Sequence, residues 1–146
     1  MKSIALVFGF SALALGFSSL ALAFSSPPET PKSLLETQVA AWNKKDLEGF
    51  MAGYWKSPEL TFFGGKEITK GWQATLERYR KKYQSEGKEM GTLSFSDLEI
   101  QIFGESAFAR GRWHLKFSDG KNAEGLFSLI LKKLPEGWRI VHDHSS

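Results

Sequence analysis

The chain has 146 residues, with 19 basic and 16 acidic side chains, 14% aromatic residues and no cysteine. This length fits a single domain with its own core, and the lack of cysteine excludes both a disulfide framework and cysteine lipidation. The formal charge of +3 is small, and basic residues are interspersed with acidic ones, which argues against nucleic acid as a partner.

The first 23 residues have the pattern of a secretory signal peptide. A lysine precedes an apolar run over residues 4–20, and Ala21 and Ala23 form an A-x-A cleavage site. Because no stop-transfer pattern follows, we expect cleavage and no stable membrane anchor, and hence a periplasmic or secreted protein. Residues 24–29, rich in proline and serine, predict a flexible leader, and residues 30–146 predict a single domain.

Helical periodicity marks three segments in the first half of this domain. Thr30 is suited to cap the first helix, whose apolar side chains share one face as far as Trp42. Asp46 is suited to cap a short second helix, which Pro58 stops. The third helix is expected to begin near Gly71, with aromatic and leucine side chains on one face and basic side chains on its wet side.

The strands follow a different period. The stretch Leu60–Gly65 predicts a short strand before the third helix. After residue 91 the side chains alternate, and turn signals divide the chain into four strands: Thr92–Phe103, Ser106–Phe117, Asn122–Lys133 and Trp138–Ser145. The apolar set of the first of these changes parity near Ser96 and Asp97, which predicts a β-bulge. Helices followed by an antiparallel meander predict an α+β domain with the helices across one face of a curved sheet.

In this order the motifs resemble the nuclear transport factor 2-like superfamily. The resemblance covers the chain from about Thr30 to Ser146 and is carried by VAAWNKKDLEGFMAGYW, GESAFARGRWHLKF and GLFSLILKKLPEGWRIVHDHSS. SnoaL-like and ketosteroid-isomerase-like domains are the most similar, and the calcium/calmodulin-dependent kinase II association domain shares the W-x-x-V-H-x-H ending. The resemblance implies a cone (a cystatin-like roll) in which a curved mixed sheet wraps around three helices, with a pocket at the wide end and a homodimer through the outer sheet face.

The resemblance does not extend to steroid isomerase chemistry. Those isomerases use an aspartate base on the strand after the second helix and a tyrosine donor in the first helix. The matching positions fall on or next to Phe63 and on Gln38. Because a phenyl ring cannot accept a proton, we expect steroid isomerase activity to be absent or at background level.

Two histidines flank an aspartate near the end of the last strand. If this strand alternates regularly, His142 and His144 share the face of Ile140 and Asp143 takes the opposite face. Together with His114, the two histidines make an alternative metal set, because three histidines with an open position can hold a catalytic zinc. In the other interpretation all three form hydrogen bonds within the sheet or at a dimer interface.

Asp143 has two interpretations. In the kinase-association relative, ligand-binding side chains lie on the parity of Asp143 and at the position of Trp113, which implies that Asp143 faces the cavity. There it would suit acid or base catalysis, with His142 or His144 as its catalytic partner. The alternative is a carboxylate paired at the sheet edge with one of three arginines: Arg110, Arg112 or Arg139.

The resemblance also implies which aromatic side chains close the wide end of the cone. Besides Trp113, the candidate ligand-binding residues are Tyr54, Trp55, Phe62, Trp72 and Tyr79, and the alternative for each is a place in the core. We therefore predict an exported homodimer that binds a small apolar or aromatic ligand and needs no cofactor. The alternatives are an isomerase, lyase or hydrolase using Asp143 and a histidine, a histidine-ligated metal hydrolase, and an assembly module whose rings fill the pocket.

Overall fold

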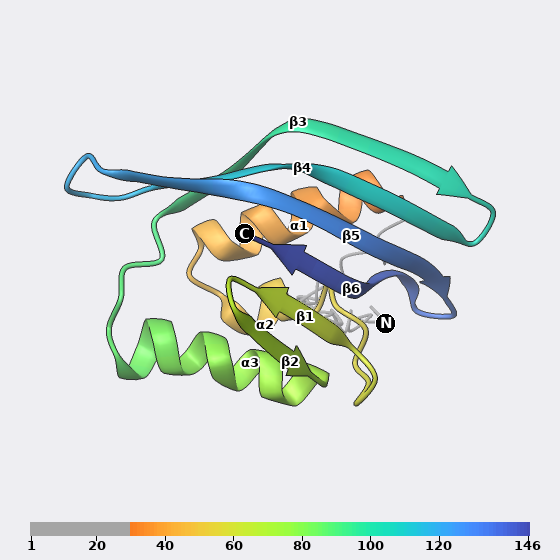
Figure 1. The fold of residues 1–146 in the computed structure, drawn as a ribbon, viewed down its shortest axis with the longest axis horizontal. Coiled ribbons are helices and arrows are strands. Elements are labelled where there is room, and N and C mark those ends of the chain that lie inside the picture. The colour runs from red at the N-terminus through yellow and green to blue at the C-terminus, as the bar shows by residue number, and fades with distance from the viewer. Residues whose placement is uncertain (1–29) are drawn as a thin grey trace, which may run out of the picture.

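The computed structural model describes residues 30–146, which form three α-helices and a six-stranded sheet (Figure 1). The predicted signal peptide and leader lie outside the described residues. The helices are α1 (Pro31–Asn43), α2 (Leu47–Met51) and α3 (Trp72–Arg80), which continues into a π-helical turn, η1 (Lys81–Ser85). The strands are β1 (Thr61–Gly64), β2 (Glu67–Lys70), β3 (Thr92–Phe103), β4 (Ser106–Lys116), β5 (Asn122–Leu134) and β6 (Gly137–Ser145).

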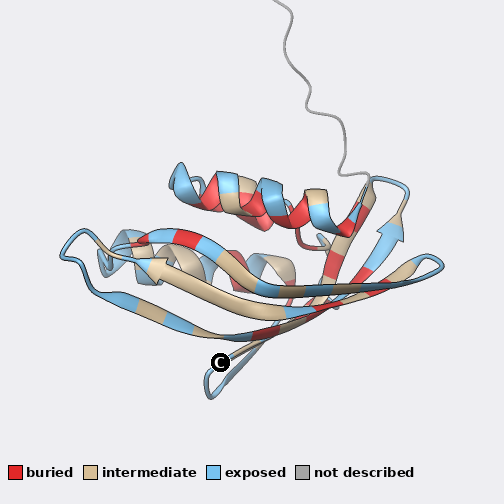
Figure 2. Ribbon diagram, turned by 90° about the horizontal axis from the view of Figure 1, so that it is seen from above, coloured by how far each residue is buried: buried red, intermediate tan, exposed pale blue. Residues whose placement is uncertain are grey.

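The sheet is mixed, curved and open, with the order β2-β1-β6-β5-β4-β3. Strands β3 to β6 form the predicted antiparallel meander, and β1 pairs in parallel with β6. Strand β2 was not predicted, because its four residues are mostly polar and carry no clear alternation. The helices lie on the concave face of the sheet, and within residues 30–146 no helix covers the opposite face (Figure 2). This arrangement confirms the predicted α+β fold class.

The helices begin where polar side chains satisfy their first backbone N–H groups. The hydroxyl of Thr30 accepts a hydrogen bond from the Ser33 backbone N–H at 3.0 Å. The Ser33 hydroxyl in turn accepts from the Thr30 backbone N–H, which completes a capping box. The Asp46 carboxylate accepts from the Gly49 N–H at 2.8 Å at the start of α2. Among the described residues, no helix is long and apolar enough to cross a bilayer.

The predicted bulge in β3 is confirmed. The register between β3 and β4 shifts between Ser96 and Glu99, and Asp97 adopts a positive φ of 51°. This extra residue lets the apolar side chains on both sides of the shift face the helices.

A second bulge, in β6, overturns the expected regular alternation. The register against β5 shifts between Ile140 and His142, which leaves Val141 as an extra residue. Ile140 is buried in the core as expected, but beyond Val141 the faces are exchanged relative to a regular strand. His142 and His144 therefore lie on the outer face, opposite Ile140, and Asp143 points inward.

The core lies between the helices and the concave face of the sheet. Its fully buried apolar side chains come from both layers and include Leu34, Met51, Leu60, Leu131 and Ile140. On the outer face, Leu126 is 56% exposed and Ile130 is 43% exposed. A single chain therefore leaves large apolar side chains of its sheet in water.

Candidate functional site

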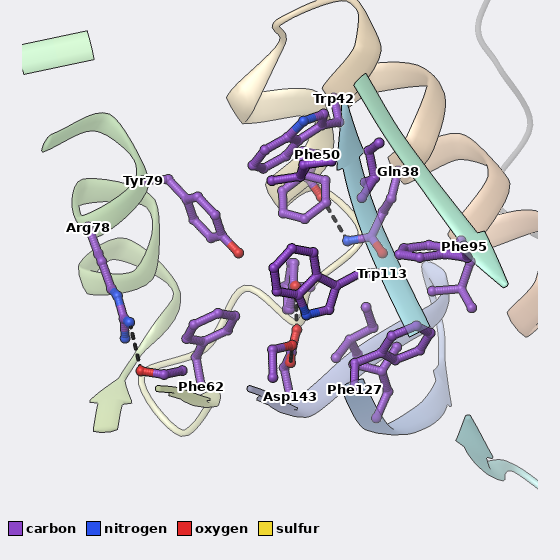
Figure 3. A pocket seen from close by; sticks show the side chains of 18 of the residues that line it. Gln38, Trp42, Phe50, Phe62, Arg78, Tyr79, Phe95, Trp113, Phe127 and Asp143 are labelled. Atoms are coloured by element: carbon purple, nitrogen blue, oxygen red, sulfur yellow. Dashed lines mark hydrogen bonds between the residues drawn. The ribbon is translucent and has the colours of Figure 1, made fainter. Parts of the chain in front are cut away.

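A cavity of about 370 Å³ opens between the helices and the concave face of the sheet (Figure 3). Small-molecule sites span roughly 300–1,000 Å³, so the cavity is large enough for a small organic molecule. Its wall is mainly aromatic, with rings from all three helical segments and most of the strands: Trp42, Phe50, Tyr54, Phe62, Tyr79, Tyr83, Phe95, Trp113 and Phe127.

The rings hold one another in place. Tyr79 packs edge-to-face against Trp42, Phe50 and Phe62, with centroid separations of 5.9, 5.5 and 5.8 Å. The Tyr79 ring also stacks on Tyr83 at 6.1 Å. Such contacts fix ring orientation, so the wall is shaped by packing among its own members and remains open at its centre. The hydroxyl of Tyr79 points into this central space (Figure 3).

Asp143 supplies the carboxyl group of the cavity. The residue is only 4% exposed, and two hydroxyl groups donate to its two oxygens. The Tyr54 hydroxyl lies 2.7 Å from Oδ2, and the Ser145 hydroxyl lies 2.7 Å from Oδ1. Both carboxyl oxygens are thus fixed in direction by neutral donors.

Burial dominates the protonation of this group. It raises the pKa of the Asp143 carboxyl from 3.8 to about 6, although the bonds from Tyr54 and Ser145 and the nearby His144 act in the opposite direction. Burial, and then the charge of Asp143, raise the pKa of both Tyr54 and Tyr79 well above the usual 10. Near neutral pH the cavity therefore combines phenols that stay protonated with one carboxyl that can gain or lose a proton.

Residues 32–146 match the family model of the SnoaL-like domain. The chain belongs to the SnoaL-like domain family. It is similar to a nuclear transport factor 2-like protein of unknown function from Shewanella oneidensis MR-1, with 35% identity, a TM-score of 0.72, and coverage of 79% of this chain and 94% of the other. The resemblance found in the sequence is thereby confirmed.

Two further structures show how widely this fold is shared. A nuclear transport factor 2-like superfamily protein from Salmonella enterica serovar Typhimurium LT2 is 27% identical, with a TM-score of 0.63 over 77% of this chain and 84% of the other. A putative calcium/calmodulin-dependent protein kinase type II association domain from Thiobacillus denitrificans is 17% identical, with a TM-score of 0.70 over 81% and 94%. The latter likeness shows the fold alone. No curated protein matches this SnoaL-like domain.

The arginines proposed as ion-pair partners of Asp143 lie elsewhere in the SnoaL-like domain. Arg110 contacts Glu99 at 2.6 Å, Arg112 contacts Glu124 at 3.4 Å, and the Arg139 guanidinium donates to the Trp138 carbonyl oxygen at 2.7 Å. Within residues 30–146, no basic side chain forms an ion pair with Asp143. In the structure Asp143 therefore faces the cavity and is not paired at the sheet edge.

The flanking histidines point away from the cavity. His142 Nδ1 lies 2.6 Å from the Thr61 hydroxyl, and burial and the neighbouring His144 lower the pKa of His142. The Phe63 ring packs edge-to-face against both imidazoles, at 5.0 and 6.0 Å. The expected pairing of a histidine with Asp143 inside the pocket is therefore not formed, because the bulge in β6 separates their faces.

The third histidine does not join the other two. His114 lies on β4, and β5 separates this strand from β6. Its Nε2 lies 2.8 Å from the Ser96 hydroxyl, and its Nδ1 lies 3.2 Å from the Glu124 carboxylate. Within the described part of the chain, no three metal-ligating side chains are grouped so that they could hold an ion. The alternative set of three histidines is thus not brought together.

The candidate pocket residues divide into two groups. Tyr54, Phe62, Tyr79 and Trp113 line the cavity. Trp55 and Trp72 lie outside its wall: the Trp55 backbone N–H donates to the Ile140 carbonyl oxygen at 2.9 Å, and the Trp72 indole N–H donates to the Met51 carbonyl oxygen at 2.8 Å. The indole of Trp72 thus joins α3 to the end of α2, and the backbone of Trp55 is bonded to β6.

Sequence reasoning missed several polar residues of the cavity wall, among them Gln38, Arg78 and Lys82. Gln38 was considered only as the counterpart of the isomerase tyrosine, and its amide donates to the Phe50 carbonyl oxygen at 3.0 Å within the wall. Arg78 and Lys82 were assigned to the wet side of the third helix; Lys82 is exposed and Arg78 is half-buried, but both also line the cavity. Their spacing of four residues, matching that of the neighbouring tyrosines, was the available signal.

Replacement of Asp143 by asparagine should stabilise the protein above pH 6. Because folding raises the pKa from 3.8 to about 6, proton binding stabilises the folded state fully below pH 3.8, and this contribution is lost as the pH rises through 6. The buried carboxylate then costs about 3 kcal/mol, a cost that the neutral amide avoids. We expect the variant to gain about 1–3 kcal/mol in free energy of unfolding at pH 8, and much less at pH 4.

Denaturant unfolding at the two pH values measures this difference. The exposed carboxylate of Glu99 provides a matched control, because Glu99→Gln should leave the pH dependence nearly unchanged. A loss of stability at pH 8 in Asp143→Asn would contradict the assignment, since it would mean that the ionised carboxylate stabilises the fold.

Proposed function

We propose that this SnoaL-like domain binds a small apolar or aromatic molecule in the cavity between its helices and its sheet. The observation that carries the proposal is the mutual packing of the wall rings around an open space that also contains one carboxyl of fixed direction. Small-molecule sites commonly combine apolar walls with a few convergent polar groups. The apolar walls provide affinity, and the polar groups orient the ligand. The Shewanella relative is itself of unknown function, so the ligand class is inferred from this cavity.

Acid or base catalysis at Asp143 is the second candidate function. It is favoured by one observation, the pKa of about 6 in a cavity that also contains the hydroxyl groups of Tyr54 and Tyr79. A carboxyl titrating near neutral pH can both accept and return a proton during one reaction. Such an enzyme would use the tyrosine hydroxyls beside Asp143, because His142 and His144 lie on the other sheet face.

We further propose that two copies associate through the outer face of the sheet. The apolar side chains of Leu126 and Ile130 are exposed there and would be covered by the same face of a second chain. The ion pair between Arg110 and Glu99 lies among them and suits a polar rim.

Export is proposed on the sequence pattern of the first 23 residues. In that case the ligand is met in the periplasm or outside the cell, where a chain without cysteine needs no redox control of its fold.

A neutral aromatic probe should bind in the cavity. We expect calorimetry with 2-naphthol to show binding to the mature protein, and at least a tenfold weaker affinity for Leu115→Trp, because the larger ring fills the space that Leu115 borders. Ala40→Trp is the matched control, since Ala40 is exposed on α1 outside the wall. Equal binding to both variants, or none to the unchanged protein, would contradict the proposed site.

The unchanged protein should sediment as a dimer at micromolar concentration. Ile130→Glu should give a monomer, because a carboxylate at this exposed position on β5 would be buried against the partner's sheet. Ala40→Glu, on the exposed face of α1, should remain a dimer. A monomeric unchanged protein would mean that the outer face is stable in water by itself.

A further inference from the structure

One side of the cavity wall carries two positive charges from the same helical segment. Arg78 on α3 and Lys82 in η1 are four residues apart and both line the cavity, next to Tyr79 and Tyr83. Arg78 extends along one side of the cavity and Asp143 lies at its floor (Figure 3). The cavity therefore has positive charge on one side and a carboxyl group at a separate position.

The guanidinium of Arg78 is held in a defined orientation. Its Nη2 donates to the Gly64 carbonyl oxygen at 3.0 Å, and its Nη1 donates to the Thr69 hydroxyl at 3.1 Å. The guanidinium carbon lies 5.1 Å from the centre of the Phe62 ring, one of the rings of the cavity wall. Since arginine has five N–H donors, these two bonds leave others for a further acceptor.

The carboxylates near these cations neutralise them only in part. Glu67 lies 3.2 Å from Arg78 Nη2, but its side chain is 72% exposed, so solvent screens the pair. Lys82 forms no ion pair with any side chain of residues 30–146, and its ammonium lies 5.1 Å from the Tyr83 ring centre. Partial burial, and then the charges of Lys88 and Arg78, lower the pKa of Lys82. An anion held between the two cations would relieve this repulsion.

The carboxyl group of Asp143 disfavours an anion at the cavity floor. The Asp143 carboxylate would repel a negative group there above pH 6, whereas its oxygens can accept a hydrogen bond from a hydroxyl group. A ligand with one acidic end thus has a single favourable orientation, with its acid at the cations and its opposite end at Asp143.

From the positions of Arg78, Lys82 and Asp143 around the aromatic wall, we propose that the ligand is a small hydroxylated aromatic acid. Its carboxylate contacts Arg78 and Lys82, its ring lies among the wall aromatics, and its hydroxyl group donates to Asp143. This inference rests on the proposed binding function and specifies the chemical class of the ligand.

Three naphthalene probes test recognition of the acidic end and of the hydroxyl end of the ligand separately: 2-naphthol, 2-naphthoate and 6-hydroxy-2-naphthoate. At pH 7 and low salt we expect 6-hydroxy-2-naphthoate to bind about tenfold more tightly than 2-naphthol, because it adds a charge-assisted contact. The substitution Lys82→Gln should weaken binding of both naphthoates about fivefold or more and leave 2-naphthol unchanged. Lys81→Gln removes the same charge one residue earlier, outside the cavity wall, and should change none of the affinities.

A second comparison tests the proposed contact between the ligand hydroxyl group and Asp143. In the unchanged protein 6-hydroxy-2-naphthoate should bind more tightly than 2-naphthoate, and Asp143→Asn should reduce this advantage while both acids still bind. If 2-naphthol binds but neither naphthoate binds better, or if Lys82→Gln weakens all three probes equally, the acid recognition is refuted and the aromatic binding site stands. If no probe binds, the proposed binding function fails as well.

Discussion

The extra residue in β6 is the constraint on which the site depends. Val141 lets Ile140 remain in the core while Asp143 also points inward, although the two residues are an odd number of positions apart. The carboxyl is thereby carried into a low-dielectric cavity, where two hydroxyl donors orient it and burial raises its pKa to about 6. The same bulge places His142 and His144 on the outer face. The carboxyl and the imidazoles of the last strand therefore lie on opposite faces of the sheet.

The helices and the other strands form the aromatic cavity around the Asp143 carboxyl. The helices of the described residues cover only the concave face of the sheet, and the cavity forms where their aromatic side chains meet those of the strands (Figures 2 and 3). Edge-to-face packing holds the rings, and the π-helical turn after α3 carries Lys82 and Tyr83 to the edge of the cavity. The exposure of Leu126 and Ile130 on the outer face follows from the placement of the helices of residues 30–146 on the other side of the sheet.

Local patterns in the sequence were sufficient to predict much of the fold. The caps at Thr30 and Asp46, the turns of the meander and the bulge near Asp97 were all marked by residues whose chemistry acts within a few positions. The bulge at Val141 left no such mark, because the residue buried beyond it is an aspartate and the pattern of apolar side chains does not show the change of face. Strand β2 was too short and too polar to be recognised.

The site was predicted only in part for a related reason. Of the predicted ligand-binding residues, Tyr54, Phe62, Tyr79 and Trp113 line the cavity, whereas Trp55 and Trp72 do not. The sequence could not separate the two groups, because a tryptophan such as Trp72, which joins two elements, has the same local pattern as one that lines a cavity. Lysine and arginine on a helix normally face water, so Lys82 and Arg78 were assigned to the solvent side. Only the three-dimensional arrangement shows that the open cavity reaches them.

The burial of the Asp143 carboxyl in the cavity can be tested by its protonation. Carboxyl-carbon NMR of the mature protein, labelled at aspartate and assigned with Asp143→Asn, would follow its titration. We expect a pKa near 6 that rises further in Ser145→Ala, because that substitution removes a hydroxyl donor to the charged form. A pKa at or below 3.8, unchanged by the loss of that hydroxyl, would place the carboxylate in water or in an ion pair and would contradict the buried site.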